Sequence, residues 1–318
     1  MAGEFDLIDR IRARIIARDD VVLGIGDDAA LLQPPAGMQL VVAMDTLNTG
    51  IHFPHDTAPA DIGWKALAVN LSDLAAMGAM PAWCTLSLSL PEPDAVWVDA
   101  FLDGFDALAR QHAVALVGGD TTRGPLSVCV TVFGFVASGR ALRRDAARVD
   151  DEIWVSGTPG DAAAALAQWS AGGAREPMLR ARLDRPTPRV ALGLRLSGFA
   201  HAAIDISDGL LADLAHVCRA SDVRAEIDID AVPMSDALRA AGLEPATRRT
   251  LQASGGDDYE LCFTAPVSAR DAIVAAALAA GVSVSRIGRI VEGEDVVAKT
   301  ADGARWAPVR AGWDHFAG

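Results

Sequence analysis

Apolar positions recur along the whole chain with two different spacings, which predict both helices and strands. A spacing near 3.6 residues predicts helices over residues 5–17, 60–77 and 95–112. Alternating or short continuous apolar runs predict strands over residues 21–25, 40–44, 83–90, 113–117 and 126–136. Because the two kinds of element alternate, the sequence predicts a mixed α/β fold.

A second domain is predicted after this first set of elements. Charged residues become frequent between residues 141 and 152, and a further predicted strand begins at Ile153. Helices and strands alternate again beyond it, and 318 residues with 51% hydrophobic content suffice for two buried cores. We therefore expect an N-terminal domain over residues 1–145 and a C-terminal α/β domain over residues 146–318.

Acidic residues beside glycine follow several of the predicted strands. They are Asp27 and Asp28 after Gly26, Asp45, Asp120 after Gly118 and Gly119, and the pair Asp205 and Asp208 before Gly209. Each alone is also typical of a turn or a helix cap. Their number exceeds what turns require, and strand ends are where α/β proteins bind ligands. The pattern favours a shared metal site, to which Asp73, in the last turn of a predicted helix, adds a carboxylate.

The formal net charge of -14 limits the ligands that such a site can take. Converging aspartates repel one another and repel phosphate unless a divalent cation neutralises them. Mg²⁺ binds a few carboxylates together with phosphate oxygens and water, which suits scattered single aspartates. The same charge argues against nucleic acid and anionic membranes as partners, because both require a basic surface.

A glycine-rich segment, residues 118–124, resembles a phosphate-binding loop in kind. Its glycines let backbone N–H groups approach an anion, and its hydroxyls and arginine add donors. The chain has no Walker A sequence and two lysines, so arginine must supply any cationic contact. Arg143 and Arg144 are either phosphate contacts or solvated loop residues, and His52 is either a substrate contact or a loop histidine.

The sequence gives little support for a zinc site, a disulfide framework, covalent catalysis or a membrane location. The four cysteines stand far apart beside apolar residues, which favours buried thiols over zinc ligands or disulfides. There is no GxSxG motif and no Cys-His pairing, so no side-chain nucleophile or base is identified. The first residues lack the apolar core of a signal peptide, and the longest apolar stretch, residues 272–282, is too short to span a bilayer. We expect a cytoplasmic protein.

As a set, these motifs resemble those of thiamine-monophosphate kinases. The resemblance runs in order from Gly3 to Phe316 and is carried by residues 24–31, 70–78, 118–124, 205–209 and 255–261. Such kinases are similar in fold to aminoimidazole-ribonucleotide synthetase. The resemblance implies a homodimer, formed through the sheet of the N-terminal domain, and implies ATP and thiamine monophosphate as substrates with several Mg²⁺ ions.

The resemblance also implies roles for individual residues. The matching metal ligands are Asp28, Asp45, Asp73, Asp120, Asp205 and Asp208, and the nucleotide contacts are Gly118, Gly119, Asp120, Arg144 and Ser207. The matching substrate-side positions are His52, Asp257 and Trp313. Met44 precedes Asp45 where hydroxyl residues are common, so only its backbone has oxygen for a metal. Asp257 replaces a frequent glutamate, and Trp313, which replaces a frequent tyrosine, either stacks on the thiamine ring or anchors the core.

The expected reaction is direct in-line transfer of the γ-phosphoryl group of ATP to thiamine monophosphate, which gives thiamine diphosphate. The acceptor phosphate is largely ionised at neutral pH, because its second pKa is about 6, so no strong base is needed. One alternative is an ATP-dependent synthetase or a selenophosphate-type enzyme, although no cysteine precedes Cys84. Another is a nucleotide sensor or scaffold that binds ATP without turnover.

Overall fold

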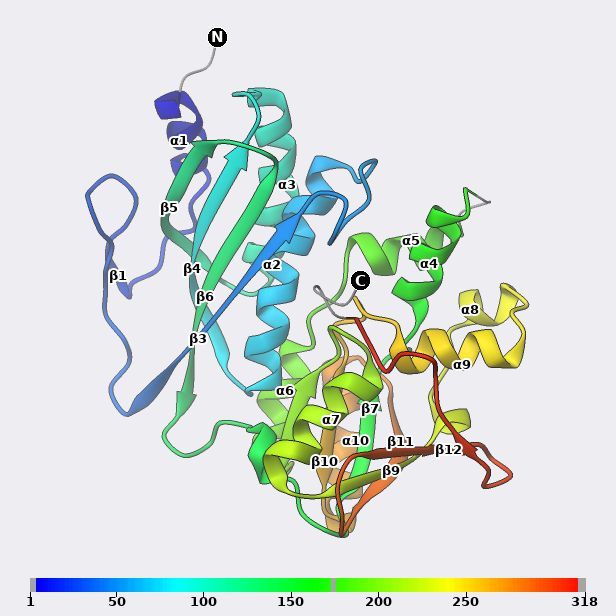
Figure 1. The fold of residues 1–318 in the computed structure, drawn as a ribbon. Coiled ribbons are helices and arrows are strands. Elements are labelled where there is room, and N and C mark those ends of the chain that lie inside the picture. Colours follow the sequence, from blue (N-terminus) through cyan, green and yellow to red (C-terminus); the bar gives the residue numbers. More distant parts are fainter. Residues whose placement is uncertain (1–3, 173–175, 314–318) are drawn as a thin grey trace. The chain divides into compact units, whose positions relative to one another are not determined.

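The computed structural model describes residues 4–172 and 176–313. Its backbone contacts divide the chain into two compact units (Figure 1). The first unit comprises Met1–Leu74 and Ala79–Gly139, and the second comprises Ala75–Gly78 and Arg140–Gly318. Each unit contains a sheet with helices, so the predicted mixed α/β fold is confirmed.

A four-stranded sheet forms the centre of the first unit. Its order is β3-β6-β4-β5, in which only the pair β4 and β5 is parallel. The strands are β3 (Met38–Asn48), β4 (Met80–Leu90), β5 (Ala115–Arg123) and β6 (Ser127–Ala137). The other elements are α1 (Glu4–Arg12), α2 (Pro59–Ala76), α3 (Ala95–Gln111), β1 (Val21–Leu23) and β2 (Leu31–Leu32).

Apolar side chains from other elements pack on both faces of this sheet. Leu74 of α2 packs against Gly134 of β6. Val21 and Leu32, from the β1–β2 pair, pack on the cluster that contains Trp83 and Phe135, whose rings meet edge to face at 4.9 Å. Burial of large aromatic rings is a main source of stability in such a core.

Helices α2 and α3 approach each other so closely that only glycine fits at the crossing. A Cβ atom on Gly104 of α3 would lie 1.7 Å from the carbonyl oxygen of Ala60, and one on Gly63 of α2 would lie 2.0 Å from that of Phe101. Real Cβ contacts do not occur at these distances. The two glycines therefore allow direct backbone packing between the helices.

The second unit is built on a seven-stranded sheet of order β13-β12-β9-β11-β7-β10-β8, antiparallel except for β12 with β9. Its strands are β7 (Glu152–Ser156), β8 (Ala202–Asp205), β9 (Arg224–Asp228), β10 (Leu261–Ala265), β11 (Val284–Val291), β12 (Val296–Lys299) and β13 (Arg305–Trp306). The helices are α4 (Asp161–Ser170), α5 (Pro177–Asp184), α6 (Val190–Leu196), α7 (Leu210–Ser221), α8 (Asp236–Ala240), α9 (Pro245–Ser254) and α10 (Arg270–Ala280). Short 3₁₀ helices cover Arg144–Ala146, Ile229–Ala231 and Val267–Ala269.

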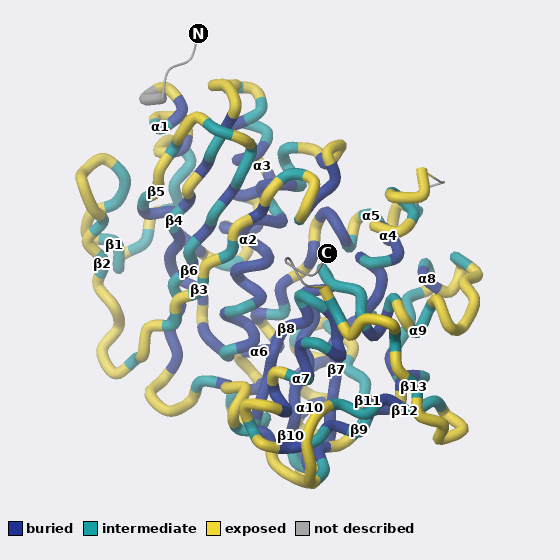
Figure 2. Tube along the Cα trace, viewed as in Figure 1, coloured by how far each residue is buried: buried dark blue, intermediate teal, exposed yellow. Residues whose placement is uncertain are grey.

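The core of the second unit lies between the sheet and α7. Leu210 and Leu214 of α7 share one buried cluster with Ile153, Ile204 and Ile227 from the strands. Figure 2 shows β7 and β10 buried along their length, as expected for inner strands covered on both faces, and the edge strand β8 is buried as well.

Three of the predicted elements have bounds that are wrong by four residues or more. The strand predicted over residues 40–44 continues to Asn48, so Asp45 lies within β3. The strand predicted over residues 113–117 becomes β5 and continues to Arg123, so most of the expected loop is strand. Its parallel pairing with β4 holds the glycines and threonines extended, although their local sequence favours a turn. The first helix ends at Arg12 instead of residue 17.

The four cysteines are free, and three of them are buried as expected, while Cys129 is only half-buried. In the part of the chain that the structure describes, no helix is both long enough and apolar enough to cross a membrane.

Candidate active site

The first unit contains a pocket of about 760 Å³ beside β5, the edge strand of its sheet. Four segments line it, namely the second half of α1, residues 24–30, two residues of β4 and residues 116–121 around β5. Four predicted residues are among them: Asp28, Gly118, Gly119 and Asp120. Asp28 and Asp120 are exposed, and Asp9 and Asp27 also line the pocket, so it offers four carboxylates beside a glycine-rich backbone.

Gly119 explains why β5 can lie so close to β4 at this pocket. Its φ angle is +152°, and a Cβ atom there would lie 1.8 Å from the carbonyl oxygen of Leu86. No other residue fits this position, so the glycine fixes the path of the strand that carries Asp120.

Arg12 also lines this pocket, and the sequence did not single it out. Arg12 lies in the last turn of α1, where a positive charge interacts favourably with the helix dipole. Its position in the sequence therefore did not indicate a ligand-binding role.

Asp45 and Asp73 are half-buried and belong to β3 and α2. The backbone N–H of Asp45 donates to Oδ1 of Asn70 at 2.9 Å, and the Asn70 amide donates to the carbonyl of Ala66 at 3.0 Å. Asn70 is fully buried one turn before Asp73. It therefore fixes β3 to the helix that carries the second aspartate.

His52 lies in the loop between β3 and α2 and is half-buried. Its Nδ1 accepts the backbone N–H of Asn48 at 2.9 Å, and its carbonyl accepts Nζ of the buried Lys65 at 2.8 Å. Because Nδ1 is an acceptor here, Nε2 carries the proton and is a donor.

In the second unit, Asp205 is the last residue of β8, and the loop from β8 to α7 carries Ser207 and Asp208. Oδ2 of Asp213, in the first turn of α7, accepts the backbone N–H groups of residues 207, 208 and 209, each at 3.1 Å. Burial raises the pKa of Asp213 to about 7, and the charges of Asp205 and Asp208 add to that shift. This internal carboxylate holds the loop in shape.

The loop before β10 pairs with the same segment through its backbone. The N–H of Asp257 donates to the carbonyl of Ser207 at 2.9 Å, and that of Tyr259 donates to the carbonyl of Ile206 at 2.8 Å. Asp257 and Tyr259 adopt φ angles of +68° and +50°. Such conformations cost about 1–3 kcal/mol each and cluster at functional sites.

Trp313 completes this group. Its backbone N–H donates to the carbonyl of Asp208 at 2.9 Å, and 55% of the residue is exposed. That exposure favours a surface contact over a core anchor. The structure thus brings together five predicted residues of the second unit: Asp205, Ser207, Asp208, Asp257 and Trp313.

The two arginines that follow the first domain differ in their contacts. Arg143 forms an ion pair with Asp145, in which Nε donates to Oδ1 at 2.8 Å. Arg144 is exposed at the start of a 3₁₀ helix, and its carbonyl accepts the hydroxyl of Ser221 at 2.7 Å. Arg143 is therefore already paired, whereas the Arg144 side chain extends into solvent.

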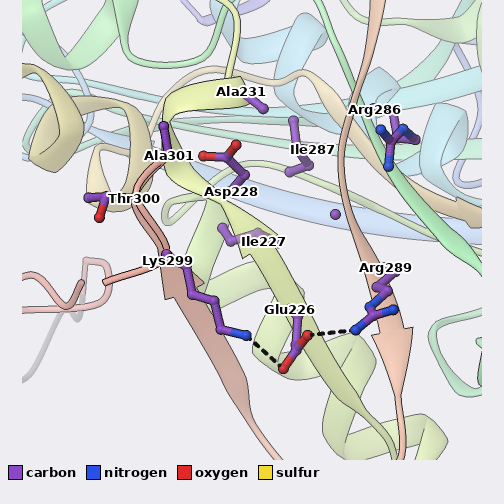
Figure 3. A pocket seen from close by; sticks show the side chains of 12 residues that line it. Glu226, Ile227, Asp228, Ala231, Arg286, Ile287, Arg289, Lys299, Thr300 and Ala301 are labelled. Carbon is purple, nitrogen blue, oxygen red and sulfur yellow. Dashed lines mark hydrogen bonds and ion pairs between the residues drawn. The ribbon is translucent and has the colours of Figure 1, made fainter. Parts of the chain in front are cut away.

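A second hollow, of about 350 Å³, lies on the exposed face of β9, β11 and β12 (Figure 3). Its lining contains none of the predicted site residues. Glu226 accepts Nζ of Lys299 at 3.0 Å and Nη2 of Arg289 at 3.3 Å (Figure 3). Such cross-strand ion pairs are typical of a solvated sheet face, so we do not assign a ligand to it.

Comparison with known proteins identifies relatives that match this chain over almost its whole length. The model of the AIR synthase related protein N-terminal domain matches residues 26–136, and that of the C-terminal domain matches residues 148–300. The thiamine-monophosphate kinase of Escherichia coli K12 is 46% identical over an alignment of 324 positions, and the match covers 99% of this chain and 98% of that protein.

Two solved structures extend the comparison to the fold. The thiamine-monophosphate kinase of Stenotrophomonas maltophilia K279a is 59% identical with a TM-score of 0.89, and the match covers 95% of this chain and 97% of that one. The structure of AaThiL complexed with AMPPCP and TMP is 33% identical with a TM-score of 0.77, and the match covers 99% and 97% of the two chains.

Proposed function

This chain belongs to the thiamine-monophosphate kinase family, within the AIR synthase related proteins, and on that premise we propose how its residues perform the family's reaction. It is an ATP-dependent kinase that phosphorylates thiamine monophosphate to thiamine diphosphate. The full-length identity to the Escherichia coli enzyme carries this conclusion, and the AaThiL complex with an ATP analogue and TMP supports it. We place the protein in the cytoplasm, where ATP is abundant.

The phosphates of ATP are proposed to bind at the pocket of the first unit. Gly118 and Gly119 present backbone there, Asp28 and Asp120 present carboxylates, and Arg12 adds a positive charge. Ser207 and Arg144 are the proposed nucleotide contacts from the second unit. In that role their hydroxyl and guanidinium donate to phosphate oxygens.

Mg²⁺ ions fit the oxygen donors that these residues offer. Within the residues that the structure describes, no three His, Cys, Asp or Glu side chains form a metal-binding group. Mg²⁺ is commonly held by one or two carboxylates together with substrate phosphates and water, which matches single aspartates on separate elements. We propose as ligands Asp28, Asp45, Asp73, Asp120, Asp205 and Asp208. Bound metal would neutralise the charge of the two anionic reactants.

The chain's own contribution to the reaction is positioning. The acceptor phosphate is already largely ionised, since its second pKa is about 6. No general base is therefore required, in agreement with the lack of one in the sequence. Held donors and a fixed in-line geometry lower the barrier in such transfers.

Thiamine monophosphate is proposed to contact His52, Asp257 and Trp313. The exposed indole of Trp313 offers a flat face on which a cationic thiazolium ring can stack. The carboxylate of Asp257 provides negative charge beside it, and Nε2 of His52 provides a donor for the phosphate.

The decisive experiment measures ADP release by the purified protein with ATP and Mg²⁺. We expect release that depends on thiamine monophosphate and is absent with thiamine or without acceptor. The family's reaction transfers to a phosphate oxygen, which thiamine lacks. If ATP binds tightly but no acceptor stimulates ADP release, the kinase function is wrong and the protein is a nucleotide sensor.

A homodimer formed through β3 is proposed for the assembly. This strand lies at the edge of its sheet and exposes Leu40, Val42 and Met44, at 48%, 53% and 62%. A long apolar edge strand is a ready surface for pairing with a second copy.

Val42→Lys is expected to convert the dimer to a monomer, because it places a charge in the middle of the apolar stripe. Sedimentation equilibrium checks this, since each chain has a mass of 33.2 kDa. Val96→Lys is the matched control, because Val96 is 80% exposed on α3 away from the stripe. Equal masses for the two variants would contradict an interface at β3.

A further inference from the structure

A buried cluster of charges lies directly behind the loop that carries Asp257. Glu260 is fully buried, and its Oε1 accepts Nη2 of Arg182 at 2.7 Å. Its Oε2 accepts Nε of Arg189 at 2.6 Å and the hydroxyl of Ser156 at 2.5 Å. A second nitrogen of Arg189 donates to Oε1, so this arginine binds the carboxylate with both arms of its guanidinium. We call these four residues the Glu260 cluster.

The Glu260 cluster is bonded to the backbone on both sides of Glu260. Nη2 of Arg182 also donates to the carbonyl of Asp258 at 3.3 Å. The Ser156 hydroxyl accepts the N–H of Leu261 at 2.9 Å. The carbonyl of Glu260 itself accepts the N–H of Ile206, next to Ser207, at 2.8 Å. The cluster therefore fixes both the loop of Asp257 and the loop of Ser207.

Stability alone does not explain a buried cluster of charges such as the Glu260 cluster. A buried ion pair is often no more stabilising than apolar residues of the same volume, whereas it fixes geometry through directed bonds. The segment that it anchors contains two residues with positive φ, Asp257 and Tyr259, which would relax without restraint.

We propose that Glu260, Arg182 and Arg189 are positioning residues, which hold Asp257 in the conformation that binds thiamine monophosphate. The proposal rests on the function assigned above. The three side chains act through the backbone of residues 257–259, so their removal should change substrate binding more than the rate of transfer.

The test compares Glu260→Gln with Glu152→Gln. Glu152 is a matched control, because it is nearly as buried, lies at the opposite end of β7 from Ser156, and also pairs with two arginines, Arg270 and Arg286. Glu260→Gln is expected to raise KM for thiamine monophosphate about tenfold or more, with kcat lowered less than about threefold. Glu152→Gln should leave both constants within about twofold, although it lowers the melting temperature similarly.

Arg182→Met provides the answer if Glu260→Gln does not fold, because the Arg182 side chain is 21% exposed and Arg189 still pairs with Glu260. Its KM for thiamine monophosphate is expected to rise about threefold at unchanged kcat. An unchanged KM in the folded variant, or an equal rise in Glu152→Gln, overturns the proposal. Failure of the assigned function would instead appear in the unaltered protein, as ADP release that is independent of thiamine monophosphate.

Discussion

Asp120→Asn is expected to lower kcat/KM about 100- to 1,000-fold, with little change in stability. Asp120 is exposed at the pocket that also contains Asp28, so asparagine fits without disturbing the core. It keeps one oxygen but removes the charge that attracts a divalent cation to the phosphates. Steady-state kinetics over a range of Mg²⁺ concentrations measure the effect, and half-saturation should move to higher Mg²⁺.

Asp236→Asn is the control for loss of one surface carboxylate. Asp236 lies on α8 with a fully exposed side chain and a weak pairing with Arg239 at 4.0 Å. Its replacement should leave kcat/KM near that of the unaltered protein. If Asp120→Asn behaves in the same way, the pocket of the first unit does not bind the metal and phosphates.

Gly104→Ala is expected to lower the free energy of unfolding by about 3 kcal/mol, the upper end of the usual cost of overpacking. The added methyl group would lie 1.7 Å from a carbonyl oxygen of α2, and a helix backbone has little freedom to move away. Alanine itself favours a helix by about 1 kcal/mol over glycine, so the measured loss is net of that gain. Urea unfolding followed by circular dichroism gives the value.

Gly198→Ala is the control for this substitution. Gly198 has an ordinary φ angle, and the nearest atom to an added Cβ lies 3.7 Å away. Its replacement should change the free energy of unfolding by less than about 0.5 kcal/mol. A comparably small change for Gly104→Ala would show that α2 and α3 do not pack through their backbones.

The regular parts of the fold were predictable from the chain alone. The helices α2 and α3 were predicted to within one residue at each end, because apolar residues recur at helical spacing along their whole length. Asp94 accepts the backbone N–H groups of Val96 and Trp97, a helix cap that fixes where α3 begins. The extension of β5 was not predictable, because its pairing with β4 is not encoded in local sequence.

The sequence marked the loops that carry the candidate site residues, but it did not reveal the contacts that support those loops. Acids beside glycine marked the loops at residues 205–209 and 255–257, yet nothing in either loop indicates that their backbones pair. Glu260 stands beside an apolar strand, and a buried acid requires a cationic partner, which is the signal that could have revealed it. Its partners, Arg182 and Arg189, lie some seventy residues earlier, so their identity depended on the fold.

The hydrogen bond from Trp313 to Asp208 can form only late in synthesis of the chain. The ribosome completes the loop of Asp208 long before Trp313 is synthesised. Within the described residues, the last strand of the second sheet ends at Trp306, so these strands are all synthesised before Trp313. A chain that stops between Trp306 and Trp313 would therefore contain every described strand of the second sheet but would lack the indole that we propose to stack on thiamine.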